Sequence, residues 1–160
     1  MRKKEREIAD RAQVDAILSA AKIVRVAFAV ENEPYVVPLS YGYDPKAGIL
    51  YVHTAREGRK IDCIEANPRI CFEVEGTSRM KAGDERGCSW GVLYESVIGY
   101  GTIRELIDPE AREAALLWIM RQQSGRDGKW TFSPEVVAVT RVWAITVESV
   151  TGKRSGPPTG

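Results

Sequence analysis

The residues best suited to chemistry lie together in one short stretch, residues 53–60. This stretch holds the only histidine of the protein, His53, and a hydroxyl group on Thr54. Gly58 follows, and after it come two cations, Arg59 and Lys60. A hydroxyl, a glycine that allows close backbone approach and two cations are groups that can hold a phosphate. The stretch therefore predicts a binding site for a phosphate group.

The elements around this stretch favour the same interpretation. Leu50, Tyr51 and Val52 are typical of a β-strand, and a short helix is expected to end at residues 67–68, Asn-Pro. The first amide groups of a helix lack partners within the helix, and the helix dipole attracts an anion there. Cations at that end oppose the dipole, which is slightly unfavourable unless an anion is bound. A solvated helix start without a ligand is the less favoured alternative.

His53 also suggests a second kind of chemistry, proton transfer. A histidine at the end of a strand, beside a cluster of cations, could act as a general acid or base. No serine or cysteine stands in a sequence context typical of a catalytic nucleophile. From the residues alone, a histidine that hydrogen-bonds a ligand or closes a barrel is therefore favoured. A catalytic histidine is the less favoured alternative.

Composition and charge exclude several classes of function. A net charge of +1 on 160 residues argues against a nucleic-acid binder. Three widely spaced cysteines and one histidine argue against a disulfide framework and a structural zinc site. The charged start at residues 1–7 is unlike a signal peptide, and no apolar run is long enough to span a membrane. We therefore expect a reduced, cytoplasmic protein with no membrane or nucleic-acid partner.

The pattern of apolar residues predicts a mainly β protein with added helices. We expect strands at 23–30, 34–43, 49–53, 69–75, 92–105 and 135–150. We expect helix at 3–21, in one piece or two, before residue 67 and from 108 to about 123, and a long loop at 76–91. The sum is a small antiparallel barrel of about six strands, forming a single domain over residues 1–150, with a C-terminal tail at 151–160.

Pro38 falls inside the second of these strands. Because proline cannot donate a backbone hydrogen bond, this position should face a sheet edge or a bulge. An edge at Pro38, Leu39 and Ser40 would present backbone groups and a hydroxyl to the polar rim of a flat ligand. A proline that only blocks aggregation of the edge is an equally good explanation.

Five segments of the chain together resemble a known protein family. They are Arg25-Val-Ala-Phe, Pro34-Tyr-Val-Val-Pro-Leu-Ser-Tyr-Gly-Tyr, Leu50-Tyr-Val-His-Thr-Ala-Arg-Glu-Gly-Arg-Lys, Asn67-Pro-Arg-Ile-Cys-Phe-Glu-Val and Val150-Thr-Gly-Lys-Arg. In these segments the chain resembles the nitroimidazole-resistance branch of the pyridoxamine 5′-phosphate oxidase-like proteins. The segment His-Thr-Ala-x-x-Gly-x-Lys is the most specific part of the resemblance.

This resemblance implies a fold, a cofactor and a set of site residues. The fold would be a Greek-key split β-barrel that works as a homodimer, with FMN bound between the subunits. His53 would sit on the reaction side, where it is linked to reduction of a nitro group. The residues implied in cofactor binding are Val37, Pro38, Leu39 and Ser40 along the flavin ring, His53, Thr54, Ala55, Gly58, Arg59 and Lys60 around the phosphate, and Ser96 near the flavin.

The implied activity is that of an FMN-dependent oxidoreductase acting on a small molecule, such as a nitroimidazole. The arginine and histidine motif that binds substrate near the end of the vitamin B6 oxidases has no counterpart here, which argues against vitamin B6 oxidation. The alternatives are a flavin-binding module without catalysis, the same barrel with haem or a deazaflavin in place of FMN, and a structural dimer with no ligand.

Overall fold

A computed structural model describes residues 3–157 of the chain. Its strands are β1 (Glu7–Ile8), β2 (Ile23–Val30), β3 (Glu33–Asp44), β4 (Ile49–Thr54), β5 (Arg69–Lys81), β6 (Gly91–Glu105) and β7 (Arg141–Ser155). Its α-helices are α1 (Arg11–Ala20), α2 (Arg59–Ala66), α3 (Pro109–Ser124) and α4 (Pro134–Val139), with short 3₁₀ turns at Lys4–Arg6 and Gly87–Ser89. No helix among the described residues is long and apolar enough to cross a membrane.

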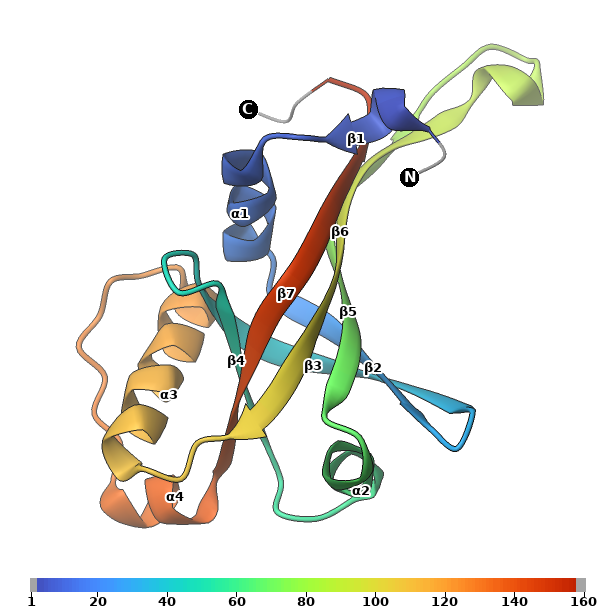
Figure 1. Cartoon of the computed structure of the whole chain (residues 1–160). Helices are drawn as coiled ribbons and strands as arrows, with labels where there is room; N and C mark the ends of the chain where they lie inside the picture. Colours follow the sequence, from blue (N-terminus) through green and yellow to red (C-terminus); the bar gives the residue numbers. More distant parts are fainter. Residues whose placement is uncertain (1–2, 158–160) are drawn as a thin grey trace.

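The strands form one antiparallel sheet that curls round on itself, as Figure 1 shows. The strand order is β1-β7-β4-β3-β2-β5-β6, and β6 also pairs with β7, which closes the ring. β5 follows the meander β2-β3-β4 and returns through α2 to lie beside β2, which is a Greek key. The predicted split barrel is confirmed: six long strands make the wall, and the two-residue β1 adds a seventh.

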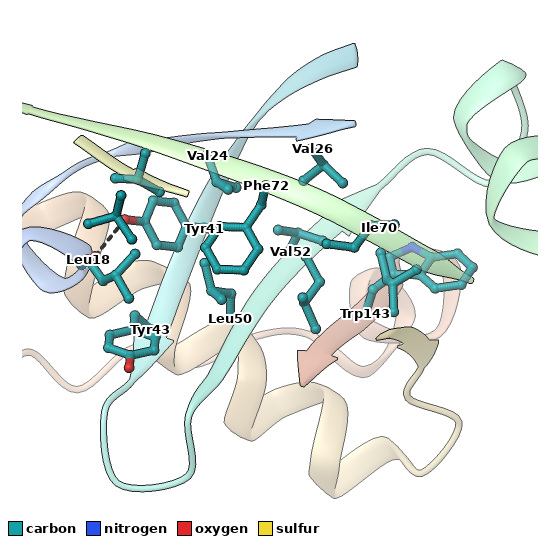
Figure 2. Packing of buried hydrophobic residues seen from close by; sticks show 14 of the residues in the cluster. Leu18, Val24, Val26, Tyr41, Tyr43, Leu50, Val52, Ile70, Phe72 and Trp143 are labelled. Atoms are coloured by element: carbon teal, nitrogen blue, oxygen red, sulfur yellow. Dashed lines mark hydrogen bonds between the residues drawn. The ribbon is translucent and has the colours of Figure 1, made fainter. Parts of the chain in front are cut away.

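The barrel interior is a packed apolar core (Figure 2). Alternate residues of each strand point inward, as the period of a pleated sheet requires. Tyr41 is buried in this core, and its hydroxyl donates a hydrogen bond to the Leu18 carbonyl at 2.5 Å, so the aromatic ring brings α1 onto the barrel. The largest fully buried side chains are Tyr41, Tyr43, Phe72, Leu18, Leu50, Ile70, Ile103 and Ile145.

Helix α3 covers the outside of β3, β4 and β7, and α4 packs against α3, with Val137 in the same apolar cluster as Val142 of β7 (Figure 1). α3 begins at the predicted signal, because the side chain of Asp108 caps the amide of Ala111 at 2.8 Å and Pro109 follows. The helix lies directly on Gly42 of β3, where a Cβ atom would clash with the backbone of Trp118. Only glycine lets the helix approach this closely, so Gly42 sets the position of α3 on the barrel wall.

Two expectations for the N-terminal half were wrong in part. The helix expected at 3–21 starts only at residue 11, because Asp10 caps it through the amide of Ala12. The loop expected at 76–91 is in part strand: β5 runs on to Lys81 and β6 begins at Gly91, and the two form an arm, at the upper right of Figure 1, with Met80 opposite Val92. The glycines and charges of this segment hid the alternating pattern of an exposed hairpin.

Two expectations for the C-terminal half also need correction. The strand expected at 135–150 begins only at residue 141, because Ser133 and Pro134 start the short helix α4. β7 then runs beyond residue 150 to Ser155, pairing with β6 and β1. The expected charged start at residues 1–2 and the tail end at 158–160 lie outside the described residues.

Candidate functional site

Strands β3 and β4 diverge at one end, and we call the place where they diverge the split. They pair only between residues 41–44 and 49–52. Beyond that point residues 33–40 of β3 pair with β2, whereas His53 and Thr54 of β4 pair with β7. In the part of the chain that the structure describes, the second edge of β3 at 33–40 therefore carries no strand. The predicted edge position of Pro38 is confirmed.

Ser40 and His53 meet at the mouth of the split. Tyr41 and Val52 are the last residues that the two strands pair, so Ser40 and His53 are the next residue on each strand. Since Tyr41 and Val52 point into the core, alternation places Ser40 and His53 on the outer face. The His53 side chain is exposed and that of Ser40 is half-buried. Two residues that are 13 positions apart in sequence thus lie at one site.

The other predicted residues of β3 divide between two faces. Pro38 is exposed on the outer face, in register with Arg25 of β2. Val37 and Leu39 are half-buried against the core. These two residues could therefore offer a ligand their backbone groups along the open edge, but not their side chains.

The first turn of α2 lies beside Tyr35, in the part of β3 whose second edge is open. Its N-cap, Gly58, has φ 122° and ψ 164°, a backbone conformation that residues with a Cβ atom avoid. The guanidinium of Arg59 lies 4.7 Å from the centre of the Tyr35 ring, which joins α2 to the open edge of β3. Lys60 follows and is half-buried. The strand edge and the helix start therefore flank the same space.

Thr54 is buried, and its hydroxyl already has two partners. It accepts a hydrogen bond from the indole N–H of Trp143 at 2.9 Å and donates one to the Ala55 carbonyl at 2.8 Å. Ala55 itself is exposed. The expectation that Thr54 and Ala55 contact a ligand stays a prediction. In this structure the Thr54 hydroxyl holds the loop that leads to α2.

The cations at the helix start are not neutralised by neighbouring carboxylates. Among residues 3–157, the ion pairs found do not include Arg56, Arg59 or Lys60. Arg141 nearby is different, because the Glu105 carboxylate lies 2.6 Å from its guanidinium and raises the pKa of Arg141 above its usual value. The site therefore keeps a local positive charge that an anion would offset.

Ser96 is the one predicted residue that the barrel does not bring to the split. It lies on the same outer face, but it is reached from Ser40 by crossing Ile23 and Glu75 on the intervening strands. Three strand spacings of ~4.8 Å put it about 14 Å from Ser40. Within one chain, Ser96 is too far away to touch a ligand held between Ser40 and Lys60.

The structure gives roles to three further residues, Tyr35, Arg141 and Trp143. Tyr35 and Trp143 lie within the strands expected at 34–43 and 135–150, but their contacts with Arg59 and Thr54 were not predicted. Their roles depend on pairings between distant segments, for which no local pattern exists. Among the described residues, no cluster of His, Cys, Asp and Glu could hold a metal ion.

The sequence and the fold are similar to those of proteins of a known family. Residues 10–154 match the family model described as pyridoxamine 5′-phosphate oxidase. A protein of Bacteroides thetaiotaomicron, provisionally assigned as a 5-nitroimidazole antibiotic resistance protein, is 28% identical; the match covers 92% of this chain and 86% of that one, with a TM-score of 0.80. A FAD-binding protein of Mesorhizobium loti is 25% identical over 94% of this chain and 98% of that one, with a TM-score of 0.67.

More distant structures share the fold. The flavocytochrome Anf3 of Azotobacter vinelandii is 19% identical, and the match covers all of this chain and 74% of that one, with a TM-score of 0.79. Among curated proteins, none matches the sequence at a significant level. The match over most of the chain and the shared barrel lead to one conclusion: the chain belongs to the pyridoxamine 5′-phosphate oxidase family and resembles its nitroimidazole-resistance branch.

Proposed function

We propose that this protein is a cytoplasmic, dimeric oxidoreductase that binds FMN at the split and reduces small acceptors such as nitroimidazoles. One observation carries the proposal: an open strand edge and an uncompensated cationic helix start flank the same space. A flavin mononucleotide has the matching parts, a flat ring with a polar rim and a terminal phosphate. Similarity to proteins described as FAD-binding and as nitroimidazole-resistance proteins supports a flavin and an acceptor of this class.

The residues at the start of α2 fit a phosphate. Arg59 and Lys60 supply positive charge, and the amide groups of the first turn are directed along the helix axis toward an incoming anion. The positive φ of Gly58 turns the chain sharply into the helix. Cations at this position oppose the helix dipole when the site is empty, and a phosphate would relieve that cost.

The open edge of β3 fits the rim of a flavin ring. Backbone groups of residues 37–39 lie along that edge, and the Ser40 hydroxyl lies at its end beside His53. A bound flavin would supply the electron-transfer chemistry, whereas the protein supplies binding and orientation. His53, exposed on the outer face, would exchange a proton with the acceptor at its imidazole nitrogen.

A second copy of the chain would complete the site. The outer face of β2, β3, β5 and β6 carries exposed apolar side chains, among which Val36 is 59% and Tyr100 48% exposed. Ser96 lies on this same face, about 14 Å from Ser40 by strand spacing. Packing two such faces together would bury the apolar residues and would let the Ser96 of one subunit approach the flavin of the other.

The absorption spectrum of the purified protein tests the cofactor. We expect a yellow protein with a flavin spectrum and one FMN per subunit after reconstitution. A haem or deazaflavin spectrum would mean that the cofactor is haem or a deazaflavin and not FMN. A colourless protein that fails to bind added FMN would refute the proposal. The protein could also bind flavin and yet fail to reduce nitroaromatic or quinone acceptors with a reduced nicotinamide as electron donor. That result would indicate a flavin-binding module instead of an enzyme.

Variants of His53 separate binding from proton transfer. His53→Gln keeps a side chain that can hydrogen-bond a ligand, whereas His53→Ala removes it. If His53 transfers a proton, both variants should lower kcat for nitro reduction by about a hundredfold while FMN stays bound. If His53 only binds the cofactor, His53→Gln should retain turnover and His53→Ala should release FMN.

A further inference from the structure

The loop that connects β4 to α2, residues 55–58, is held by strand β7 from behind. Arg141 of β7 donates from Nη1 to the carbonyl oxygen of Arg56 at 3.3 Å. Trp143, two residues further along β7, holds the Thr54 hydroxyl, which in turn donates to the carbonyl oxygen of Ala55. The Arg56 carbonyl is thus bonded directly by β7, and the Ala55 carbonyl is linked to β7 indirectly, through the Thr54 hydroxyl of β4.

Arg141 is well placed to act as a fixed brace. Its guanidinium contacts Glu105 of β6 at 2.6 Å and Glu65 of α2 at 3.4 Å, and it lies 4.6 Å from the centre of the Trp143 ring. It therefore joins the loop, the helix α2 and two strands of the barrel wall. Because two carboxylates already offset its charge, Arg141 is suited to positioning other groups and not to binding an anion itself.

The hydrogen bonds to these carbonyl groups decide whether backbone N–H or C=O groups of the loop can face an anion. In a planar trans peptide, the C=O of one residue and the N–H of the next point in opposite directions. Holding the Arg56 carbonyl toward Arg141 therefore turns the amide of Glu57 away from β7. The Ala55 carbonyl is held by the Thr54 hydroxyl, which turns the amide of Arg56 away from that hydroxyl. The carbonyl of Gly58 is also engaged, since it accepts from the amides of Ile61 and Asp62. Three carbonyl oxygens that would repel an anion are kept away from it.

A cavity of about 440 Å³ lies beside the loop at this place, lined by Arg56, Glu57, Glu105, Arg112, Arg141 and residues 138–140. Without the guanidinium of Arg141, the Arg56 peptide could rotate into this space and present its carbonyl to the site. The contacts of Arg141 thus fix an orientation that the surrounding packing leaves free.

We propose that Arg141, supported by Trp143, is a positioning residue for phosphate binding: it orients the loop 55–58 so that amides and not carbonyls face the phosphate. This inference rests on the proposed function, in which the start of α2 receives the phosphate of FMN. It adds two residues of β7, far from the loop in sequence, to the groups that set the affinity for the cofactor.

Comparison of FMN with riboflavin tests this proposal, because the two ligands differ only in the phosphate. Arg141→Gln should weaken FMN binding by about tenfold, equivalent to ~1.4 kcal/mol, while riboflavin binding changes much less. Trp143→Phe, which keeps an aromatic ring under the guanidinium but removes the N–H, should act in the same direction. Arg112→Gln is the matched control, because Arg112 also reaches Glu105 but, among residues 3–157, makes its hydrogen bond to the Leu106 carbonyl and none to the loop.

Hydrogen exchange gives a readout that is independent of affinity and activity. In the wild type, FMN should slow amide exchange in the peptide that covers residues 55–58, and Arg141→Gln should remove that protection. Equal losses of FMN and riboflavin affinity in Arg141→Gln, or equal effects of Arg141→Gln and Arg112→Gln, would overturn the positioning role. If the wild type binds neither ligand, the proposed function itself fails. If Arg141→Gln does not fold, Trp143→Phe carries the comparison.

Discussion

Replacing Gly58 by alanine tests how the loop before α2 is built. Gly58 has φ 122° and ψ 164°, and a Cβ atom added there would meet no other atom within 4 Å. The substitution therefore introduces backbone strain without a clash. Strain of this kind costs about 1–3 kcal/mol, which for a chain of this size lowers the unfolding temperature by about 2–4 °C for each kcal/mol.

Gly87→Ala is a matched control for this measurement. Gly87 is also exposed and also has open space around its Cα, but its φ lies outside the positive region. Both alanine variants reduce the freedom of the unfolded chain, an effect of about 0.4–1 kcal/mol that cancels in the comparison. Urea unfolding of the protein without added cofactor should show Gly58→Ala less stable than Gly87→Ala by about 1–3 kcal/mol. Equal stabilities would refute the assigned strain.

Three further predictions concern the cofactor site, the packing of α3 and the effect of pH. Lys60→Met should weaken FMN binding by about 1.5–3 kcal/mol, whereas Lys46→Met, in an exposed turn, should leave it unchanged in a flavin titration. Gly42→Ala should push α3 off the barrel at Trp118 and cost about 1–3 kcal/mol or more in urea unfolding, and wild-type stability would contradict the close approach. Burial raises the pKa of Tyr43 to about 12. Since the unfolded chain loses this proton near pH ~10, stability should fall as pH rises from ~10 to ~12, and a Tyr43→Phe variant should lose less.

The sequence predicted most of the barrel because its strands carry strong local signals. β2, β3 and β4 are rich in β-branched and aromatic residues and are joined by tight turns, so their bounds agree within two residues. α3 was found from its Asp-Pro start. Where local signals are weak, the prediction was wrong: the arm of β5 and β6 leaves even Met80 and Val92 exposed, and the residues after the Ser133–Pro134 helix start were predicted as strand.

The candidate site could be predicted only in part, for a related reason. The motif at 53–60 is contiguous in sequence, and Pro38 marks an edge by its chemistry alone. The meeting of Ser40 with His53 depends on the register of β3 and β4, and the contacts of Arg141 depend on pairing across 85 positions. Such long-range contacts arise from closure of the barrel and have no signature in a local pattern.

The central claim is that the split, flanked by the open edge of β3 and the start of α2, holds a flavin by its phosphate. Titration of the apoprotein with FMN and with riboflavin, followed by flavin fluorescence, tests this claim most directly. The account predicts one FMN bound per subunit and an affinity for riboflavin that is weaker by at least about tenfold. Equal affinity for the two ligands, or no binding of either, would contradict it.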